Sequence, residues 1–169
     1  TNTLMGASEN AAGYHWIVNG QSMGVVGPEN SESRIDFVNF GHLIGGDKSD
    51  SFRIEVGGWV SHINGGEGQD FVDRSKHEGN LEVTISESFN SGGDFTITSI
   101  EGLIGNGGSN SKWSATLRAE SGENIWTIGG ANEAQDGVND GTVQQVGGTE
   151  MVFRDFDYLQ GGSGDDTFR

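Results

Sequence analysis

The chain has 169 residues, of which 32% are hydrophobic, 30 are glycine and one is proline. This length fits one domain, the near-absence of proline excludes collagen, and the low apolar content favours a narrow core along an elongated structure over a broad two-layer core. The net charge is −16, with 25 acidic against 9 basic residues, which argues against nucleic acid or an anionic membrane as a partner.

Short runs of alternating apolar and polar residues follow one another along the chain, separated by glycine-rich turns. Runs of this kind, rich in β-branched or aromatic residues, are typical of strands. Almost no helix is expected, because no segment combines a helical period with caps. In chain order the expected strands include SFRIEV (51–56), LEVTIS (81–86), DFTITSI (94–100), WSATLRA (113–119) and EMVFRDF (150–156).

One phrase occurs three times. It reads FVNFGHLIGGDKSDSF from Phe37, ITSIEGLIGNGGSNSKW from Ile97 and FRDFDYLQGGSGDDTF from Phe153. The shared frame is an aromatic residue or Ile, two residues, another aromatic residue or Ile, two residues, Leu, then glycine and a polar turn. Internal repetition of this kind is the sequence signature of repeat architectures.

A second phrase precedes the first and third copies and aligns Trp16 with Trp126. Residues 1–52 and 114–168 are therefore expected to be two copies of one segment. Residues 53–113 form the intervening half-repeat, so that the chain covers about one and a half periods of a large repeat.

Glycine doublets recur at intervals near 20 residues, which is about one coil of a parallel β-helix. We therefore predict an all-β fold, a single repetitive parallel β-helix (β-solenoid) over residues 1–169 with coils of about 20 residues. A β-sandwich built from the same strands is the alternative. In a solenoid, inward residues of successive coils stack on one another. The predicted core consists of Trp16, Phe40, Leu43, Phe52, Ile100, Leu103, Trp113, Trp126, Phe156, Leu159 and Phe168.

Three turns have the chemistry of a calcium site. INGGEGQDFVD and LQGGSGDDTF match the nonapeptide G-G-x-G-x-D-x-hydrophobic-x, whereas LIGGDKSDSF lacks the third glycine. Calcium takes about six to eight oxygens, and glycines let a turn aim its carbonyls inward. Plain Asp/Gly turns without metal are the alternative, because the matches are isolated rather than in direct tandem. The predicted calcium-binding residues are Asp47, Asp50, Gly65, Gly66, Asp70, Asp73, Gly161, Gly162, Asp165 and Asp166.

Together, the W-x-I, F-x-x-F-x-x-L-x-G-G and G-G-x-G-x-D elements resemble the repeats of giant bacterial hemagglutinin-like surface adhesins that carry RTX-type calcium-binding repeats. The resemblance covers essentially the whole chain. It implies an extracellular or cell-surface protein whose β-solenoid folds with calcium and serves as a stalk or adhesive surface. Calcium ions and neighbouring repeats of the same protein are then the expected partners, without membrane insertion.

Catalysis is not expected. Parallel β-helices also host polysaccharide lyases and epimerases, but these need carboxylates and bases clustered on one sheet face. The four histidines follow no ligand or triad spacing. A carbohydrate-binding module on the same scaffold is the alternative function. Tyr14 and Trp59 are its candidate residues for stacking on surface glycans, because neither has an aromatic partner in the repeat register.

Overall fold

The all-β prediction is confirmed by the computed structural model. The structure describes residues 2–8, 12–85, 89–90, 95–107, 111–119, 122–129, 140–145 and 148–169. These residues form strands and turns, and they include no helix with the length and apolar character needed to cross a membrane. The strands are β1 (Asn2–Met5), β2 (Tyr14–Gly20), β3 (Met23–Pro28), β4 (Ile35–Val38), β5 (Phe40–Gly46), β6 (Ser51–Ile54), β7 (His62–Gly66), β8 (Phe71–Asp73), β9 (Leu81–Ile85), β10 (Phe89–Asn90), β11 (Thr96–Thr98), β12 (Gly102–Ile104), β13 (Ala115–Ala119), β14 (Asn124–Ile128), β15 (Gly141–Gln145), β16 (Glu150–Arg154), β17 (Tyr158–Gln160) and β18 (Thr167–Phe168).

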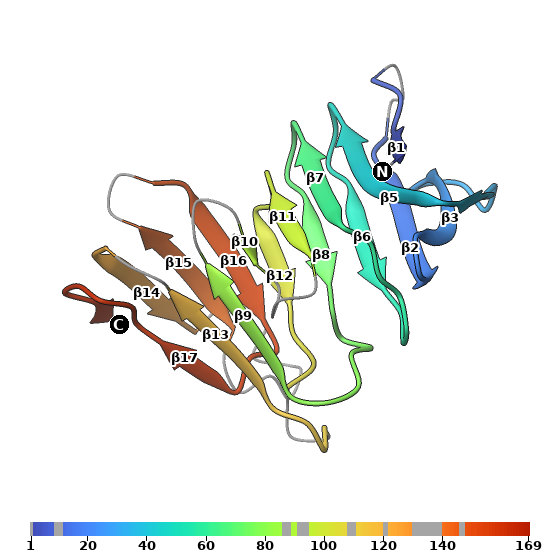
Figure 1. Ribbon diagram of the computed structural model, residues 1–169. Coiled ribbons are helices and arrows are strands. Elements are labelled where there is room, and N and C mark those ends of the chain that lie inside the picture. The colour runs from blue at the N-terminus through green and yellow to red at the C-terminus, as the bar shows by residue number, and fades with distance from the viewer. Residues whose placement is uncertain are drawn as a thin grey trace.

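The strands assemble into two sheets. Sheet A has the order β1-β5-β7-β11-β10-β9-β13-β17, and sheet B has the order β18-β14-β15-β16-β12-β8-β6-β2-β3-β4. The chain passes repeatedly from one sheet to the other, so that β5, β7 and β11 of sheet A are followed by β6, β8 and β12 of sheet B. Figure 1 shows the strands side by side from the N-terminal end at β1 to the C-terminal end at β17. The molecule is therefore elongated across its strands.

Both sheets are open and mixed. Parallel pairing joins β1, β5, β7 and β11 in sheet A and β2, β6, β8 and β12 in sheet B. Antiparallel pairing joins β2 to β3 and β3 to β4, β14 to β15 and β15 to β16, and β9 through β10 to β11. We call the stretch of chain between a residue and its parallel register partner one pass. The antiparallel strands make some passes longer than others. Leu43 pairs with Ile63, 20 residues on, but Ile63 pairs with Ile97, 34 residues on. The expected spacing of about 20 residues thus holds for this first step and not for the next.

An unbroken row of large apolar side chains runs along the inner face of sheet B. Its members are register partners on five parallel strands, and each is 2% exposed or less. Burial of one such side chain stabilises the fold by about 1.5–3 kcal/mol. The row therefore forms the narrow core that the composition predicts. Its residues are Trp16, Phe52, Val72, Leu103 and Phe153.

The core prediction is wrong at two residues, Trp113 and Phe168. Trp113 is 37% exposed and lies before β13, with the Lys112 ammonium 5.2 Å from its ring centroid. The second copy of the phrase has no aspartate in its turn, and the chain after it crosses from sheet B to sheet A, whereas after the first and third copies it crosses from sheet A to sheet B. Phe168 is 47% exposed, because β18 is the edge strand of sheet B. Phe40 and Leu159 are partly buried against the core.

The thrice-repeated phrase marks a corner between the sheets. Its third residue has a left-handed backbone in every copy, with φ of 66° at Asn39, 51° at Ser99 and 57° at Asp155. Short polar side chains tolerate this conformation better than branched ones. The first and third copies turn from sheet B into sheet A, whereas the second turns from sheet A into sheet B. Leu103 therefore lies in sheet B, while Leu43 and Leu159 lie in sheet A.

The two long segments that the sequence aligns fold with the same strand order. β1 to β6 and β13 to β18 each pass through the sheets in the order A, B, B, B, A, B. Trp16 stacks on Phe52 with ring centroids 5.6 Å apart and an interplanar angle of 14°. Trp126 stacks on Phe168 at 5.4 Å and 8°. The aligned tryptophans thus make the same contact in both segments.

Candidate functional site: the turn carboxylates

The aspartates that close the glycine-rich turns lie inside the molecule. Asp50 follows the turn after β5, and Asp70 follows the turn after β7. Their side chains are 2% and 0% exposed, respectively. A carboxylate is removed from water at this depth only where hydrogen bonds or opposite charges compensate. The partners of these two side chains therefore decide what the turns do.

Each buried carboxylate binds the backbone of the pass before it. Asp50 Oδ1 accepts the N–H of Tyr14 at 2.5 Å, and Asp70 Oδ1 accepts the N–H of Asp50 at 2.6 Å. Glu101 Oε2 accepts the N–H of Asp70 at 2.8 Å. Hydrogen bonds to an ionised acceptor are about twice as strong as neutral ones. We call Asp50, Asp70 and Glu101 the carboxylate ladder, because together they connect four successive passes of the chain.

The same contact recurs at the other end of the molecule. Asp166 Oδ1 accepts the backbone N–H of Asn124 at 3.2 Å and its side-chain amide at 2.8 Å. Asn124 precedes Trp126 by two residues, as Tyr14 precedes Trp16. Asp166 in the second segment thus does what Asp50 does in the first.

In each of the three calcium-like turns, the first glycine of the doublet leaves space for the aspartate side chain. A Cβ at Gly45 would overlap Asp50 Oδ2, and one at Gly65 would overlap Asp70 Oδ2. The same holds for Gly161 and Asp166. The spacing from this glycine to the aspartate is therefore a packing requirement of the turn, whether or not a metal is bound.

Alanine at the two positions of one doublet is expected to have different effects. Gly45→Ala should lower the free energy of unfolding by about 1–3 kcal/mol, because the added Cβ would overlap the Gly65 carbonyl and the Asp50 carboxylate. Gly46→Ala is the matched control, since its Cβ would have no neighbour closer than 3.8 Å, and it should change stability by about 0.5 kcal/mol or less. Urea denaturation measures both, and equal effects would contradict the packing argument.

Burial disfavours the ionised form of the two aspartates of the ladder. Desolvation raises the pKa of Asp50 to about 6, against the lowering effect of the Tyr14 N–H and of the nearby Trp16 indole, which makes no hydrogen bond of good geometry. Desolvation likewise raises the pKa of Asp70 to about 7; the Asp50 N–H opposes this rise, and the charges of Asp50 and Glu101 add to it. The Oδ2 atoms of both aspartates are buried without a hydrogen-bond partner. Two unpaired carboxylate oxygens thus remain inside the fold.

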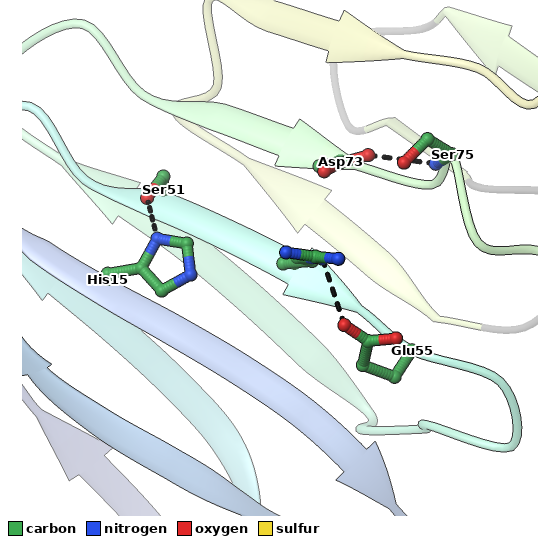
Figure 2. Close-up of polar contacts among 6 residues, drawn as sticks. His15, Ser51, Glu55, Asp73 and Ser75 are labelled. Carbon is green, nitrogen blue, oxygen red and sulfur yellow. Dashed lines mark hydrogen bonds and ion pairs between the residues drawn. The ribbon is translucent and has the colours of Figure 1, made fainter. Parts of the chain in front are cut away.

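The other predicted calcium-binding residues are spread over several turns. Asp47 and Asp165 are exposed. Asp73 ends β8, and its Oδ1 accepts the N–H of Ser75 at 2.8 Å (Figure 2). Within the described ranges, no three acidic or histidine side chains are grouped closely enough to hold a metal ion. The orphan Oδ2 atoms of Asp50 and Asp70 fit a cation in charge, but carbonyls or water would have to supply the remaining ligands.

Sequence reasoning missed two carboxylates that make the same kind of contact. Glu101 holds the N–H of Asp70, and Asp157 Oδ2 accepts the N–H of Ala115 at 2.8 Å. Both directly follow the second hydrophobic residue of the corner phrase, where the first copy has Gly41. The shared position was visible in the alignment, but these carboxylates lie outside the calcium-like turns.

The candidate glycan-stacking residues lie apart from each other. The Tyr14 ring packs against Trp16 with centroids 6.2 Å apart, and its hydroxyl accepts the N–H of Ala7 at 3.3 Å. The Trp59 backbone is bonded near the far end of β2, where its N–H donates to the Gly20 carbonyl at 3.1 Å. A strand of this length separates its ends by about 20 Å. Tyr14 and Trp59 therefore do not share one sugar-sized platform, and glycan binding stays a prediction.

One serine–histidine contact is present on the outer face of sheet B. Figure 2 shows the His15 ring directed at Ser51, with Nδ1 2.8 Å from Oγ. Burial, followed by the charges of Arg34 and Arg53, lowers the pKa of this histidine. A hydrolytic triad also needs a carboxylate that orients the imidazole. In the part of the chain that the structure describes, no carboxylate hydrogen-bonds to His15. The absence of catalysis stays a prediction.

Comparison of the chain with protein-family models, with curated proteins and with solved structures finds no match.

Proposed function

We propose that this chain is a structural, rod-forming repeat domain of a large secreted or surface protein, in which calcium stabilises an adhesive or supporting stalk. The observation that carries this proposal is the recurrence of one contact: a turn carboxylate holds the backbone of the preceding pass in both long segments. Contacts that repeat along the molecule are what a structure built by stacking requires. A site for a single substrate would instead be made of side chains that occur once.

The arrangement of the core supports the same proposal. The row of large apolar side chains in sheet B extends across five parallel strands, and the two aligned tryptophans make the same stacking contact. Each pass is stabilised mainly by the passes on either side of it. We therefore interpret the parallel portions of the two mixed sheets as a β-solenoid that is interrupted by antiparallel hairpins.

The buried carboxylates of the ladder are the reason that we propose calcium. Asp50 and Asp70 each keep one carboxylate oxygen without a partner, and the whole chain carries a net charge of −16. A divalent cation that binds only the folded state would offset this charge and shift the folding equilibrium toward the folded form. Extracellular modules commonly bind calcium with dissociation constants of about 0.1–1 mM. Folding would then be favoured outside the cell.

The test is thermal unfolding in excess EDTA and in a few millimolar calcium, followed by circular dichroism. Calcium is expected to raise the melting temperature of the natural chain by about 5 °C or more, which corresponds to roughly 1–2 kcal/mol for a chain of this size. Magnesium at the same concentration is the control for simple charge screening.

The variant Asp70→Asn locates the effect. It keeps an oxygen that can accept the Asp50 N–H and removes the negative charge. The calcium-induced shift should shrink by half or more in this variant if the ladder attracts the ion. Identical melts in EDTA and in calcium for the natural chain would contradict the calcium part of the proposal and leave a metal-free rod.

A further inference from the structure

The outermost strands at the C-terminal end, β17 and β18, match an interior pair of strands in the first segment, but no described strand packs on their outer side. β17 is the edge strand of sheet A, and β18 is the edge strand of sheet B. They occupy the place in the second segment that β5 and β6 occupy in the first. Leu159 and Phe168 each follow their counterparts Leu43 and Phe52 by 116 residues (159 − 43 and 168 − 52).

In the first segment, β7 and β8 cover this layer. β5 pairs with β7 in parallel, with Leu43 opposite Ile63, and β6 pairs with β8, with Phe52 opposite Val72. The turn between β7 and β8 also contributes Asp70, which accepts the N–H of Asp50. Because of this cover, Leu43 and Phe52 are both 0% exposed.

In the second segment, the corresponding surface is open. Phe168 is 47% exposed and Tyr158 is 58% exposed, and Leu159 is only partly buried. In the described part of the chain, the N–H of Asp166 has no counterpart of the bond that Asp50 makes to Asp70. The surface thus presents an apolar strip, two strand edges and one backbone donor. In the first segment, β7 and β8 cover the same three features.

We propose that the β17–β18 end is a docking surface for a strand–turn–strand segment with the chemistry of residues 62–73. The segment has an apolar residue before a glycine doublet, and an aspartate two residues before a second apolar residue. It adds a parallel strand to each sheet, with its apolar residues opposite Leu159 and Phe168. Its aspartate accepts the N–H of Asp166. This inference rests on the proposed rod and specifies the kind of segment that would extend it.

A second copy of the same chain fits this end less well. The N-terminal edges are β1 in sheet A and β4 in sheet B. Their counterparts β13 and β16 pair inside the molecule with β9 and β12, not with β5 and β6. Head-to-tail stacking would therefore create a junction that the described part of the chain does not contain, whereas the β7–β8 segment covers the equivalent layer, β5 and β6, in the first segment.

The test is a chain extended after Arg169 by a second copy of residues 54–74, because Arg169 is the counterpart of Arg53. Backbone amides of residues 158–168 should exchange with deuterium about tenfold more slowly in the extended chain than in the natural chain. The matched control carries the same extension with aspartate at the positions that copy Ile63 and Val72. Unchanged exchange in β9 and β13 verifies that each variant is folded.

Equal exchange in the extended chain and its control would overturn the proposal. Protection of residues 158–168 that rises with the concentration of the natural chain would also overturn it, because a second copy would then occupy the end. Neither outcome depends on calcium, so failure here is distinguishable from failure of the proposed calcium-stabilised rod, which the melts in EDTA and calcium test separately.

Discussion

Phe52→Ala is expected to lower the free energy of unfolding by about 3–5 kcal/mol, the usual loss for a buried phenylalanine. The ring is 0% exposed and stacks on Trp16 at 5.6 Å. Its removal leaves a cavity between two passes, where Val72 on one side and Trp16 on the other cannot close the gap without moving a whole strand.

Phe168→Ala is the matched control, because the same aromatic pair recurs there with only one covered face. Phe168 stacks on Trp126 at 5.4 Å but is 47% exposed, so we expect a loss of about 1 kcal/mol. Urea denaturation followed by tryptophan fluorescence measures both losses. Similar losses at the two positions would contradict the assignment of Phe52 to the interior and Phe168 to an open end.

Asp70→Ala is expected to destabilise the protein by about 3 kcal/mol, because it leaves the Asp50 N–H buried without an acceptor and opens a small cavity. Asp70→Asn keeps an acceptor and removes a charge whose burial is unfavourable, so at pH 8 without calcium it should be at least as stable as the natural chain. A loss of stability in the asparagine variant as large as in the alanine variant would show that the ionised carboxylate itself is required.

The pH dependence of stability gives a second measure of the same group. The pKa of Asp70 is raised to about 7 in the folded state, from an ordinary value of 3.8. The folded state therefore takes up the proton first, and the natural chain should become more stable as the pH falls from 8 to 5, by about 2–4 kcal/mol from this side chain. Asp70→Asn should lack most of this gain in urea denaturation at the two pH values.

Most of the core residues predicted from the aligned phrases are buried, and the exposed exceptions Trp113 and Phe168 both lie at the last position of a phrase. Trp16, Phe52 and Trp126 are buried because large apolar side chains that recur in register have few alternatives to stacking on one another. The alignment could not reveal which sheet each copy enters. The corner phrase fixes a left-handed residue and a change of direction, and this local geometry serves equally well at Asn39, leaving sheet B, and at Ser99, leaving sheet A.

The candidate site was only partly visible in the sequence. The glycine-to-aspartate spacing identified Asp50 and Asp70 as turn residues with a special role, because few other features place a carboxylate at a fixed distance from glycine. Their inward direction and their backbone partners come from contacts 36 and 20 residues away along the chain. Pairings of this range depend on the lengths of the intervening hairpins, which local patterns do not determine.

The direction of the interstrand hydrogen bonds has a mechanical consequence. Because the strands lie across the long dimension of the molecule and the two termini are at opposite ends, a pull on the termini loads these bonds along their own axes (Figure 1). We expect the passes to peel away from an end one at a time rather than shear together. Register partners 20 and 34 residues apart would release about 70 Å and 120 Å of chain in successive steps. A chain of this kind, pulled at both ends, would lengthen in stages, and each stage would lower the force on its points of attachment.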